Sequence, residues 1–193
     1  MRRVFYLTSS NPKSILIAME DLKIRPVTEE DAPAITGLYN PYITNTTITF
    51  EEEPVSAEEM LQRIHKVLAI PFPWLCAEVN GRLAGYAYAA RWRERSAYRF
   101  VAESTIYMDP AFSGQGIGRQ LYIELLNQLR AAGMHTVMGV ITIPNPASIA
   151  LHESLGFVKV AHFPEVGYKF NQWLDVGYWQ LTFAEACRNQ LKN

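Results

Sequence analysis

The chain has 193 residues, of which 49% are hydrophobic and 19% charged, and its formal net charge is −1. This is the composition of one globular domain with a sizeable core, and the near-neutral charge gives no support to nucleic-acid binding. Cys76 and Cys187 lie far apart with no cluster of Cys and His around them, which fits a reducing cytoplasm and argues against structural zinc. No apolar run approaches the ~20 residues of a membrane span. We therefore expect a cytoplasmic protein that uses no metal, nucleic acid or membrane.

The predicted organisation is a poorly ordered N-terminal extension, one domain and a short C-terminal tail: residues 1–22, 23–183 and 184–193. The extension begins with two arginines and the apolar residues 4–7, but polar residues 9–13 interrupt this run. No clear cleavage site of small residues follows, so a signal peptide is not favoured. Met19 stands just before the first predicted strand, which leaves both Met1 and Met19 open as the start of translation.

The first half of the domain is predicted to contain a strand, two helices and a hairpin. Residues 28–31 form a capping-box pattern that indicates a helix start, and Asn40-Pro41 is predicted to end that helix. Asn80-Gly81 between two apolar runs is a strong hairpin signal. The predicted elements are a strand at 23–26, helices at 28–39 and from 56 onward with Met60, Ile64 and Leu68 on one face, and strands at 74–79 and 83–90.

The second half alternates strands and helices. Asn145 is a favourable N-cap with Pro146 at the first helical position, and Gly133 and Gly156 are predicted helix ends. The predicted elements are a strand at 101–108, a helix bearing Leu121, Leu125 and Leu129, a strand at 136–141, a helix from 145, and strands at 157–161 and 176–183. The whole pattern predicts an α/β (α+β) fold, with a mixed, mostly antiparallel central sheet and helices on both faces.

A glycine-rich turn, with Gly114, Gly116 and Gly118, joins the strand at 101–108 to the following helix. The first N–H groups of a helix have no partner inside it, and with the helix dipole they form an anion site. We therefore predict a phosphate-bearing cofactor here; the alternative is a turn that only joins strand to helix. The turn matches neither of two common phosphate-binding motifs. A P-loop would need Lys and then Ser or Thr after the last glycine, and the dinucleotide-binding fingerprint would need a third glycine at the position of Arg119.

Four further stretches carry a more specific pattern: Trp92-x-x-Arg95-x-Ala97-Tyr98, residues 101–107, residues 144–157 with Leu151-His152-Glu153, and residues 167–180 with Gly167-Tyr168-Lys169 and Trp173-x-Asp175. In this order they resemble phosphinothricin acetyltransferases and the related bacterial enzymes that acetylate methionine sulfoximine and methionine sulfone, within the GNAT superfamily. The glycine turn then corresponds to the superfamily's loop for the pyrophosphate of acetyl-CoA. Ser113 stands where Arg or Gln is usual, and we expect a modest loss of affinity because backbone N–H groups carry most of the binding.

The resemblance implies a GNAT fold, a homodimer, and direct transfer of acetyl from acetyl-CoA to the α-amine of a small amino acid analogue. The acceptors it implies are of the phosphinothricin, methionine sulfoximine or methionine sulfone type, and no metal is involved. The residues it implies for acetyl-CoA binding are Ile106, Tyr107, Met108, Ser113, Gly114, Gln115, Gly116, Ile117, Gly118, Arg119, Asn145 and Ser154.

Glu103 and His152 are the candidate catalytic residues. Glu103 resembles the family's general base, and a carboxylate in an apolar context at a strand end is expected to have a raised pKa. His152 takes the place where many relatives in the superfamily carry a Tyr as general acid, so it could protonate the leaving thiolate. The alternatives are an exposed Glu without partners and a half-buried His with a structural hydrogen bond, and Tyr107 could act as the acid instead.

An arginine-rich segment, residues 91–99, is predicted to bind the acceptor, because arginines bind carboxylate, phosphinate and sulfonyl oxygens in a bidentate manner. A solvated loop is the alternative. The candidate substrate-binding residues are Phe50, Trp92, Arg93, Glu94, Arg95 and Tyr98. Near the C-terminus, the aromatic side chains around Trp173 are expected to pack the end of the sheet or a subunit interface.

Two other functions remain open from the sequence: acetylation of proteins or peptides, and a non-catalytic acyl-CoA sensor. The bulky Phe50 and Trp92 favour a closed pocket over a peptide groove, and a sensor has no need for an acid and a base. The physiological role is either detoxification of such analogues or the handling of oxidised amino acids.

Overall fold

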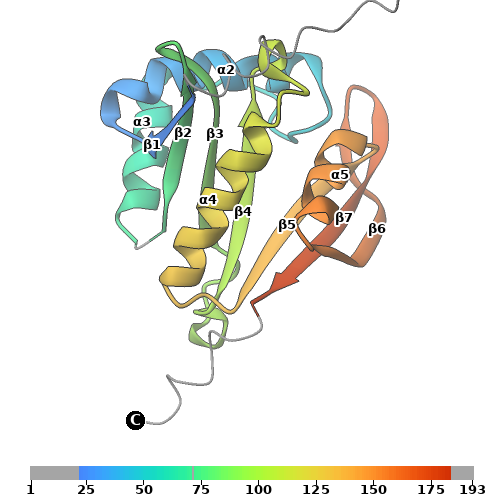
Figure 1. Ribbon diagram of the computed structural model, residues 1–193. Coiled ribbons are helices and arrows are strands. Elements are labelled where there is room, and N and C mark those ends of the chain that lie inside the picture. Colours follow the sequence, from blue (N-terminus) through green and yellow to red (C-terminus); the bar gives the residue numbers. More distant parts are fainter. Residues whose placement is uncertain (1–21, 71, 184–193) are drawn as a thin grey trace, which may run out of the picture.

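The computed structural model describes residues 22–70 and 72–183, so the predicted extension before Leu22, Met19 included, and the tail lie outside the described residues. Seven strands form one sheet in the order β1-β2-β3-β4-β5-β7-β6 (Figure 1). The strands are β1 (Leu22–Pro26), β2 (Trp74–Val79), β3 (Arg82–Arg91), β4 (Val101–Met108), β5 (Thr136–Ile143), β6 (Val158–Lys169) and β7 (Gln172–Thr182). The β4–β5 pair is parallel and every other neighbouring pair is antiparallel, which confirms the predicted mixed sheet.

Helices cover both faces of this sheet, as predicted. On one face lie α4 (Ile117–Ala131) and α5 (Pro146–Ser154), and on the other lie α2 (Ala32–Asn45) and α3 (Ala57–Leu68) (Figure 1). Alternate residues of β4 mark the two faces, because successive side chains of a strand point to opposite sides. Ser104 contacts Tyr122 of α4, whereas the ring of Tyr107 packs against Tyr39 of α2 at 4.8 Å between centroids.

Helix α4 buries the face that its sequence periodicity predicts. Helix α3 does so only in part, because Leu68, predicted on one face with Met60 and Ile64, is 47% exposed at the end of the helix, and Val67 is buried instead. Leu121, Leu125 and Leu129 of α4 are each 0% exposed, and Met60 and Ile64 of α3 are also buried. Each such side chain contributes about 1.5–3 kcal/mol through its removal from water. The core therefore fixes α4, and with it the turn at its N-terminus, against the sheet.

Helix α2 continues to Asn45, through Pro41, so the predicted end at Asn40-Pro41 is wrong. A proline inside a helix costs about 3 kcal/mol. Tertiary contacts on both sides of Pro41 offset this cost: the Asn40 side chain bonds both backbone groups of Val55, and the Tyr42 hydroxyl donates to the Met108 carbonyl. Neither contact can be predicted from the residues that neighbour Pro41 in the sequence.

The last two strands form a longer hairpin than predicted. β6 continues to Lys169 and β7 already begins at Gln172, beyond the predicted bounds of 157–161 and 176–183. The register shifts between Phe163 and Gly167, and such an irregularity interrupts the alternation of polar and apolar residues by which a strand is recognised.

The parallel ladder between β4 and β5 is short. It pairs Val101–Ser104 with Thr136–Gly139 only, and beyond Ser104 the two strands diverge, as Figure 1 shows. Residues 105–108 keep their antiparallel partners on β3, whereas their edge toward β5 has none. The divergence opens the sheet beside the glycine turn.

Candidate active site

A groove of about 620 Å³ fills the opening between β4 and β5. Its walls come from the second half of β4, the glycine turn, the first turns of α5 and the segment between α2 and α3. The predicted site residues that line it are Phe50, Glu103, Ile106, Tyr107, Met108, Ser113, Gly114, Gly116, Gly118, Arg119, Asn145 and His152. The fold therefore gathers most predicted cofactor residues, and both predicted catalytic residues, around one groove.

The glycine turn has the geometry of an anion site. Gly114 and Gly116 have φ values of +73° and +77°, which only glycine adopts readily, and Gly116 is the N-cap of α4. A Cβ atom built on either glycine would meet no atom within 4 Å, so the space over the turn is open to a ligand. The free N–H groups at the start of the 15-residue α4 face this turn and suit a pyrophosphate.

Two predicted cofactor residues in this turn offer only their backbone. The Gln115 side chain donates to the Ala111 carbonyl at 3.3 Å, and the Ile117 side chain is in the core at 2% exposure. Asn145 caps α5 as predicted, since its Oδ1 accepts from the Ser148 N–H at 3.2 Å, and it also lines the groove.

Glu103 is half-buried in β4 and lines the groove. Burial raises the pKa of its carboxyl group, and the positive charge of Arg93 opposes this rise. The predicted raised pKa is thereby confirmed. Within the described part of the chain its carboxylate makes no hydrogen bond or ion pair, so its lone pairs are available to a ligand.

His152 is 3% exposed, and both of its ring nitrogens have partners within the protein. Nδ1 lies 2.8 Å from the Ser148 carbonyl oxygen, and Nε2 lies 2.9 Å from the Tyr122 hydroxyl. Burial lowers the pKa of the ring, and the bond to the Ser148 carbonyl opposes this. This is the geometry of the alternative named above, a His that makes structural hydrogen bonds. It leaves neither ring nitrogen free to reach a sulfur atom directly.

Tyr107, the other candidate acid, is packed among aromatic rings. Its ring lies edge-on to those of Tyr39 and Tyr42, and burial raises its pKa well above the usual value. A strongly raised pKa makes the phenol a poor proton donor at neutral pH.

A second hollow, of about 410 Å³, lies on the α2/α3 side of the sheet. Its walls include Trp74 and Tyr88, whose rings stack at 4.4 Å, and Tyr107, which also lines the groove. Ala90 lines the hollow and pairs directly with Glu103 across the β3–β4 ladder, so the two residues are neighbours on one face. Charged side chains complete the rim of the hollow: Arg63, Lys66, Arg91 and Glu94.

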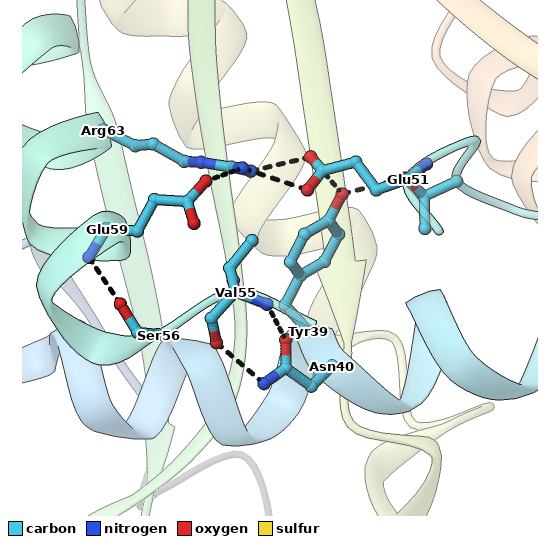
Figure 2. A network of polar contacts seen from close by, with 8 residues as sticks. Tyr39, Asn40, Glu51, Val55, Ser56, Glu59 and Arg63 are labelled. Carbon is cyan, nitrogen blue, oxygen red and sulfur yellow. Dashed lines mark hydrogen bonds and ion pairs between the residues drawn. The ribbon is translucent and has the colours of Figure 1, made fainter. Parts of the chain in front are cut away.

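A loop between α2 and α3 forms one wall of the groove, and a polar network fastens it (Figure 2). The Tyr39 hydroxyl lies 2.8 Å from Thr49 Oγ1 and donates to Glu51 at 3.0 Å, while Arg63 donates to the same carboxylate at 2.7 Å. From the end of β6, Lys169 Nζ donates to the Thr49 carbonyl at 2.8 Å. We call residues 46–55 the roof loop; it carries Phe50, whose ring occupies the space that a side chain at Gly167 would need.

The described residues contain no group of three or more His, Cys, Asp or Glu side chains arranged to hold a metal ion. Over the same residues, no helix is long and apolar enough to cross a membrane.

Residues 24–177 match the family described as acetyltransferase (GNAT) domain. The chain belongs to the GNAT acetyltransferase family. Phosphinothricin N-acetyltransferase of Streptomyces viridochromogenes is 40% identical to this GNAT chain over 162 residues, which are 84% of this chain and 88% of that protein. The L-methionine sulfoximine/L-methionine sulfone acetyltransferase of Salmonella typhimurium is 35% identical over 164 residues, 85% of this chain and 96% of that protein.

Solved GNAT structures agree with the fold. The phosphinothricin acetyltransferase of Sinorhizobium meliloti, solved in complex with acetyl-CoA, superposes with a TM-score of 0.83 at 35% identity, covering 86% of this chain and 91% of that one. The family and the fold class predicted from the sequence are thus confirmed.

Seven predicted site residues of this GNAT protein lie outside both cavities: Gln115 and Ile117, described above, and Trp92, Arg93, Arg95, Tyr98 and Ser154. The Trp92 ring packs edge-on against Tyr178, and the Arg93 guanidinium lies over the Trp92 ring, 4.7 Å from its centroid. The Ser154 hydroxyl donates to the Leu151 carbonyl one turn back in α5. In the single chain these side chains therefore do not contact the groove, which differs from the prediction. Glu94, by contrast, reaches the rim of the hollow.

The sequence missed other residues around the two cavities. The aromatic walls Trp74, Tyr86 and Tyr88 have the alternation of ordinary buried strands, which hides a pocket. Arg91 had a signal, since it belongs to the arginine-rich segment, and it lines the hollow.

Proposed function

We propose that this protein transfers acetyl from acetyl-CoA to the α-amine of a small amino acid analogue of the phosphinothricin, methionine sulfoximine or methionine sulfone type. The observation that carries the proposal is a single groove that joins an open glycine turn at a helix N-terminus to a carboxylate with a raised pKa. The activities of the relatives from Streptomyces viridochromogenes and Salmonella typhimurium, and the acetyl-CoA in the Sinorhizobium meliloti structure, support it.

Acetyl-CoA fits along the groove with its pyrophosphate at the glycine turn. The pantetheine arm then follows the free edge of residues 105–108, whose N–H groups toward β5 have no strand partner. Such donors also suit the oxygen that becomes negative when the thioester carbonyl is attacked. Asn145 lies on the opposite wall, where it can contact the arm.

Glu103 acts as the general base. An α-ammonium cannot attack a carbonyl, so it must first lose a proton, and the Glu103 carboxylate takes this proton directly or through a water. The nitrogen attacks the thioester carbon, the C–S bond breaks, and the electron pair leaves on sulfur. No acetyl group is bound covalently to the protein.

The hollow beside Glu103 receives the side chain of the acceptor. Its aromatic walls suit an apolar stem, and its rim offers the guanidinium of Arg91 and the ammonium of Lys66 to an anionic end. A hollow of about 410 Å³ is the size of a small-molecule site, which favours an amino acid over a protein or peptide acceptor.

We further propose a homodimer that works in the cytoplasm, where acetyl-CoA is available, and detoxifies such analogues. Large apolar side chains are exposed on the β6–β7 hairpin: Val158, Val160, Phe163, Val166, Tyr168, Phe170 and Trp173. Exposed apolar patches of this kind mark interaction surfaces. A partner chain at this hairpin would cover them.

The test is steady-state release of CoA, with acetyl-CoA and a panel of phosphinothricin, methionine sulfoximine, methionine sulfone, common amino acids and a short peptide. We expect rapid turnover of one or more analogues that bear oxygen on phosphorus or sulfur. Turnover of the peptide alone would support protein acetylation instead, and binding of acetyl-CoA without any turnover would support a sensor.

A further inference from the structure

Five groups from four elements form one buried chain of polar contacts beside the groove. As described above, the two ring nitrogens of His152 contact the Ser148 carbonyl and the Tyr122 hydroxyl, at 2.8 and 2.9 Å. The Tyr122 hydroxyl lies 2.6 Å from Ser104 Oγ, which lies 3.2 Å from the carbonyl oxygen of Met138. This proton network runs from α5 through α4 and β4 to β5, at the point where the β4–β5 ladder ends.

The network is one proton short when His152 is neutral. Both of its ends are carbonyl oxygens, which only accept hydrogen bonds, so four hydrogen bonds in a row need four protons. Ser104, Tyr122 and a neutral imidazole together bring three. An imidazolium brings the fourth, and then every contact is a hydrogen bond.

The geometry indicates which contact is empty in the neutral state. Nδ1 of His152 carries the proton because its partner is a carbonyl; the Ser148 hydroxyl, at 3.4 Å, is a more distant neighbour. Nε2 then accepts from Tyr122, and Tyr122 accepts from Ser104. The Ser104 hydroxyl has one proton, which it can donate either to Tyr122 or to the Met138 carbonyl. With Nδ1 protonated it donates to Tyr122, and the contact with Met138, at 3.2 Å the longest of the four, is left without a proton. Ser104 lines the groove.

No charged side chain of the described residues contacts the imidazole. Tyr122 of α4 is the titratable group in contact with it, Phe157 packs at 5.0 Å between ring centroids, and Gly139 of β5 lies under the ring. On α5 itself, the Glu153 carboxylate accepts from the Trp179 indole. Since burial lowers the pKa of His152, the resting ring is neutral at neutral pH and the network has room for a proton.

We propose that Ser104 and Tyr122 form a proton relay that connects the buried His152 to the groove and passes a proton from the acceptor nitrogen to the sulfur of CoA. This inference rests on the proposed acetyl transfer. An ammonium loses two protons on its way to an amide nitrogen; Glu103 takes the first, before attack, and the relay takes the second, after attack.

Each transfer conserves protons along the chain. The second proton binds to Ser104 Oγ, the former Ser104 proton moves to Tyr122, and the former Tyr122 proton moves to Nε2 of His152. When the C–S bond breaks and the electron pair moves to sulfur, the imidazolium returns its proton to Tyr122. Tyr122 passes its own to Ser104, and Ser104 protonates the thiolate. Burial raises the pKa of Tyr122, as it does for Tyr107, so Tyr122 gives up a proton only as it receives another and is never a phenolate. His152 and Tyr122 thus reach the reacting atoms only through Ser104.

The first test reads the tautomer of His152 by nitrogen NMR of the imidazole in the full chain without ligands. We expect the neutral ring to carry its proton on Nδ1. A proton on Nε2 would overturn the proposal. This measurement needs no turnover. It therefore shows where the protons of the resting network lie even if no acceptor in the acetylation assay is a substrate.

The second test cuts the relay at two points, with Tyr122→Phe and Ser104→Ala, and compares kcat and solvent isotope effects. We expect each variant to lower kcat at least about tenfold, because positioned proton transfer contributes about 10²–10⁴-fold. The KM for acetyl-CoA should stay unchanged, and the double variant should be no slower than either single one, since members of one unit are not additive.

The proton inventory separates a relay from a merely structural role. In mixtures of H₂O and D₂O, the plot of wild-type rate against deuterium fraction should be curved, because several protons move. The same plot for Tyr122→Phe should be closer to a straight line. Tyr178→Phe, on β7 and outside the network, is the matched control and should keep the curvature. An unchanged kcat and an unchanged curve in Tyr122→Phe would overturn the relay while leaving the acetyl transfer itself intact.

Discussion

Glu103 can act as a base only while its carboxyl group is ionised. Because burial raises the pKa of this group, the ionised fraction declines at a higher pH than for an exposed Glu. We therefore expect kcat/KM to fall as the pH is lowered through this raised pKa, and Glu103→Gln to remove this acidic limb and lower kcat by about 10²–10⁴-fold. The measurement is CoA release against pH. Glu124→Gln, on α4, is the control, and a limb that survives in Glu103→Gln would assign the base to another group.

Gly139 shows how closely a backbone position can depend on one side chain. A Cβ atom there would lie 2.5 Å from Nε2 of His152. The ring cannot yield without breaking its bonds to Ser148 or Tyr122. Gly139→Ala is expected to cost about 1–3 kcal/mol of stability and to reduce kcat.

Gly37→Ala is the matched control for this substitution, because a Cβ atom there meets nothing within 4 Å. In a helix this change is neutral or stabilises by up to about 1 kcal/mol. Urea unfolding of both variants gives the two free energies. Equal stabilities would mean that His152 is free to move.

At the scale of elements, local signals account for what the sequence predicts well. Asn80-Gly81 gives the β2–β3 turn, Asn145 caps α5, and leucines at helical spacing place the buried face of α4. The passage of α2 through Pro41 and the irregular β6–β7 hairpin depend instead on contacts with distant segments, which no local pattern contains.

The same distinction applies to the candidate site. Glu103 and the glycine turn follow from short motifs. The partners of His152 do not, because Tyr122 is 30 residues away in the sequence and meets it only after α4 and α5 have packed. Family resemblance indicated a role for His152, but only the packed structure shows that both of its nitrogens are engaged.

The roof loop is an element whose position depends on few bonds. The Glu51 carboxylate accepts hydrogen bonds from Tyr39 and Arg63, so Glu51→Gln replaces a bidentate ion pair with weaker contacts (Figure 2). Since the pair is partly exposed, we expect a loss of only about 0.2–1 kcal/mol in stability. Arg63, the partner of Glu51, lines the hollow proposed for the acceptor, so its release should raise the KM for the acceptor several-fold.

Acceptor saturation curves for Glu51→Gln and for the control Glu58→Gln, at the exposed start of α3, test this expectation. Equal KM values for the two variants and the wild type would show that Arg63 and the roof loop keep their places without this pair.

At the scale of the whole molecule, the exposed side chains of β6 and β7 predict a second subunit. Trp173 is 61% exposed, the second most exposed large apolar side chain of the described residues. Trp173→Glu would place a charge in the proposed interface, so we expect sedimentation to find a dimer for the wild type and a monomer for the variant. Lys66→Glu, on α3, is the control. A monomeric wild type would refute this interface.

The sheet consists of two antiparallel halves, β1–β4 and β5–β7–β6, and four residue pairs of one parallel ladder join them. A cosubstrate lying in the groove contacts both halves and so stabilises their association. A ligand present at a hundred times its dissociation constant adds about 2.7 kcal/mol to the stability of the folded state. The metabolic supply of acetyl-CoA would then govern two things at once: how fast the protein works and how long each copy survives proteolysis in the cell.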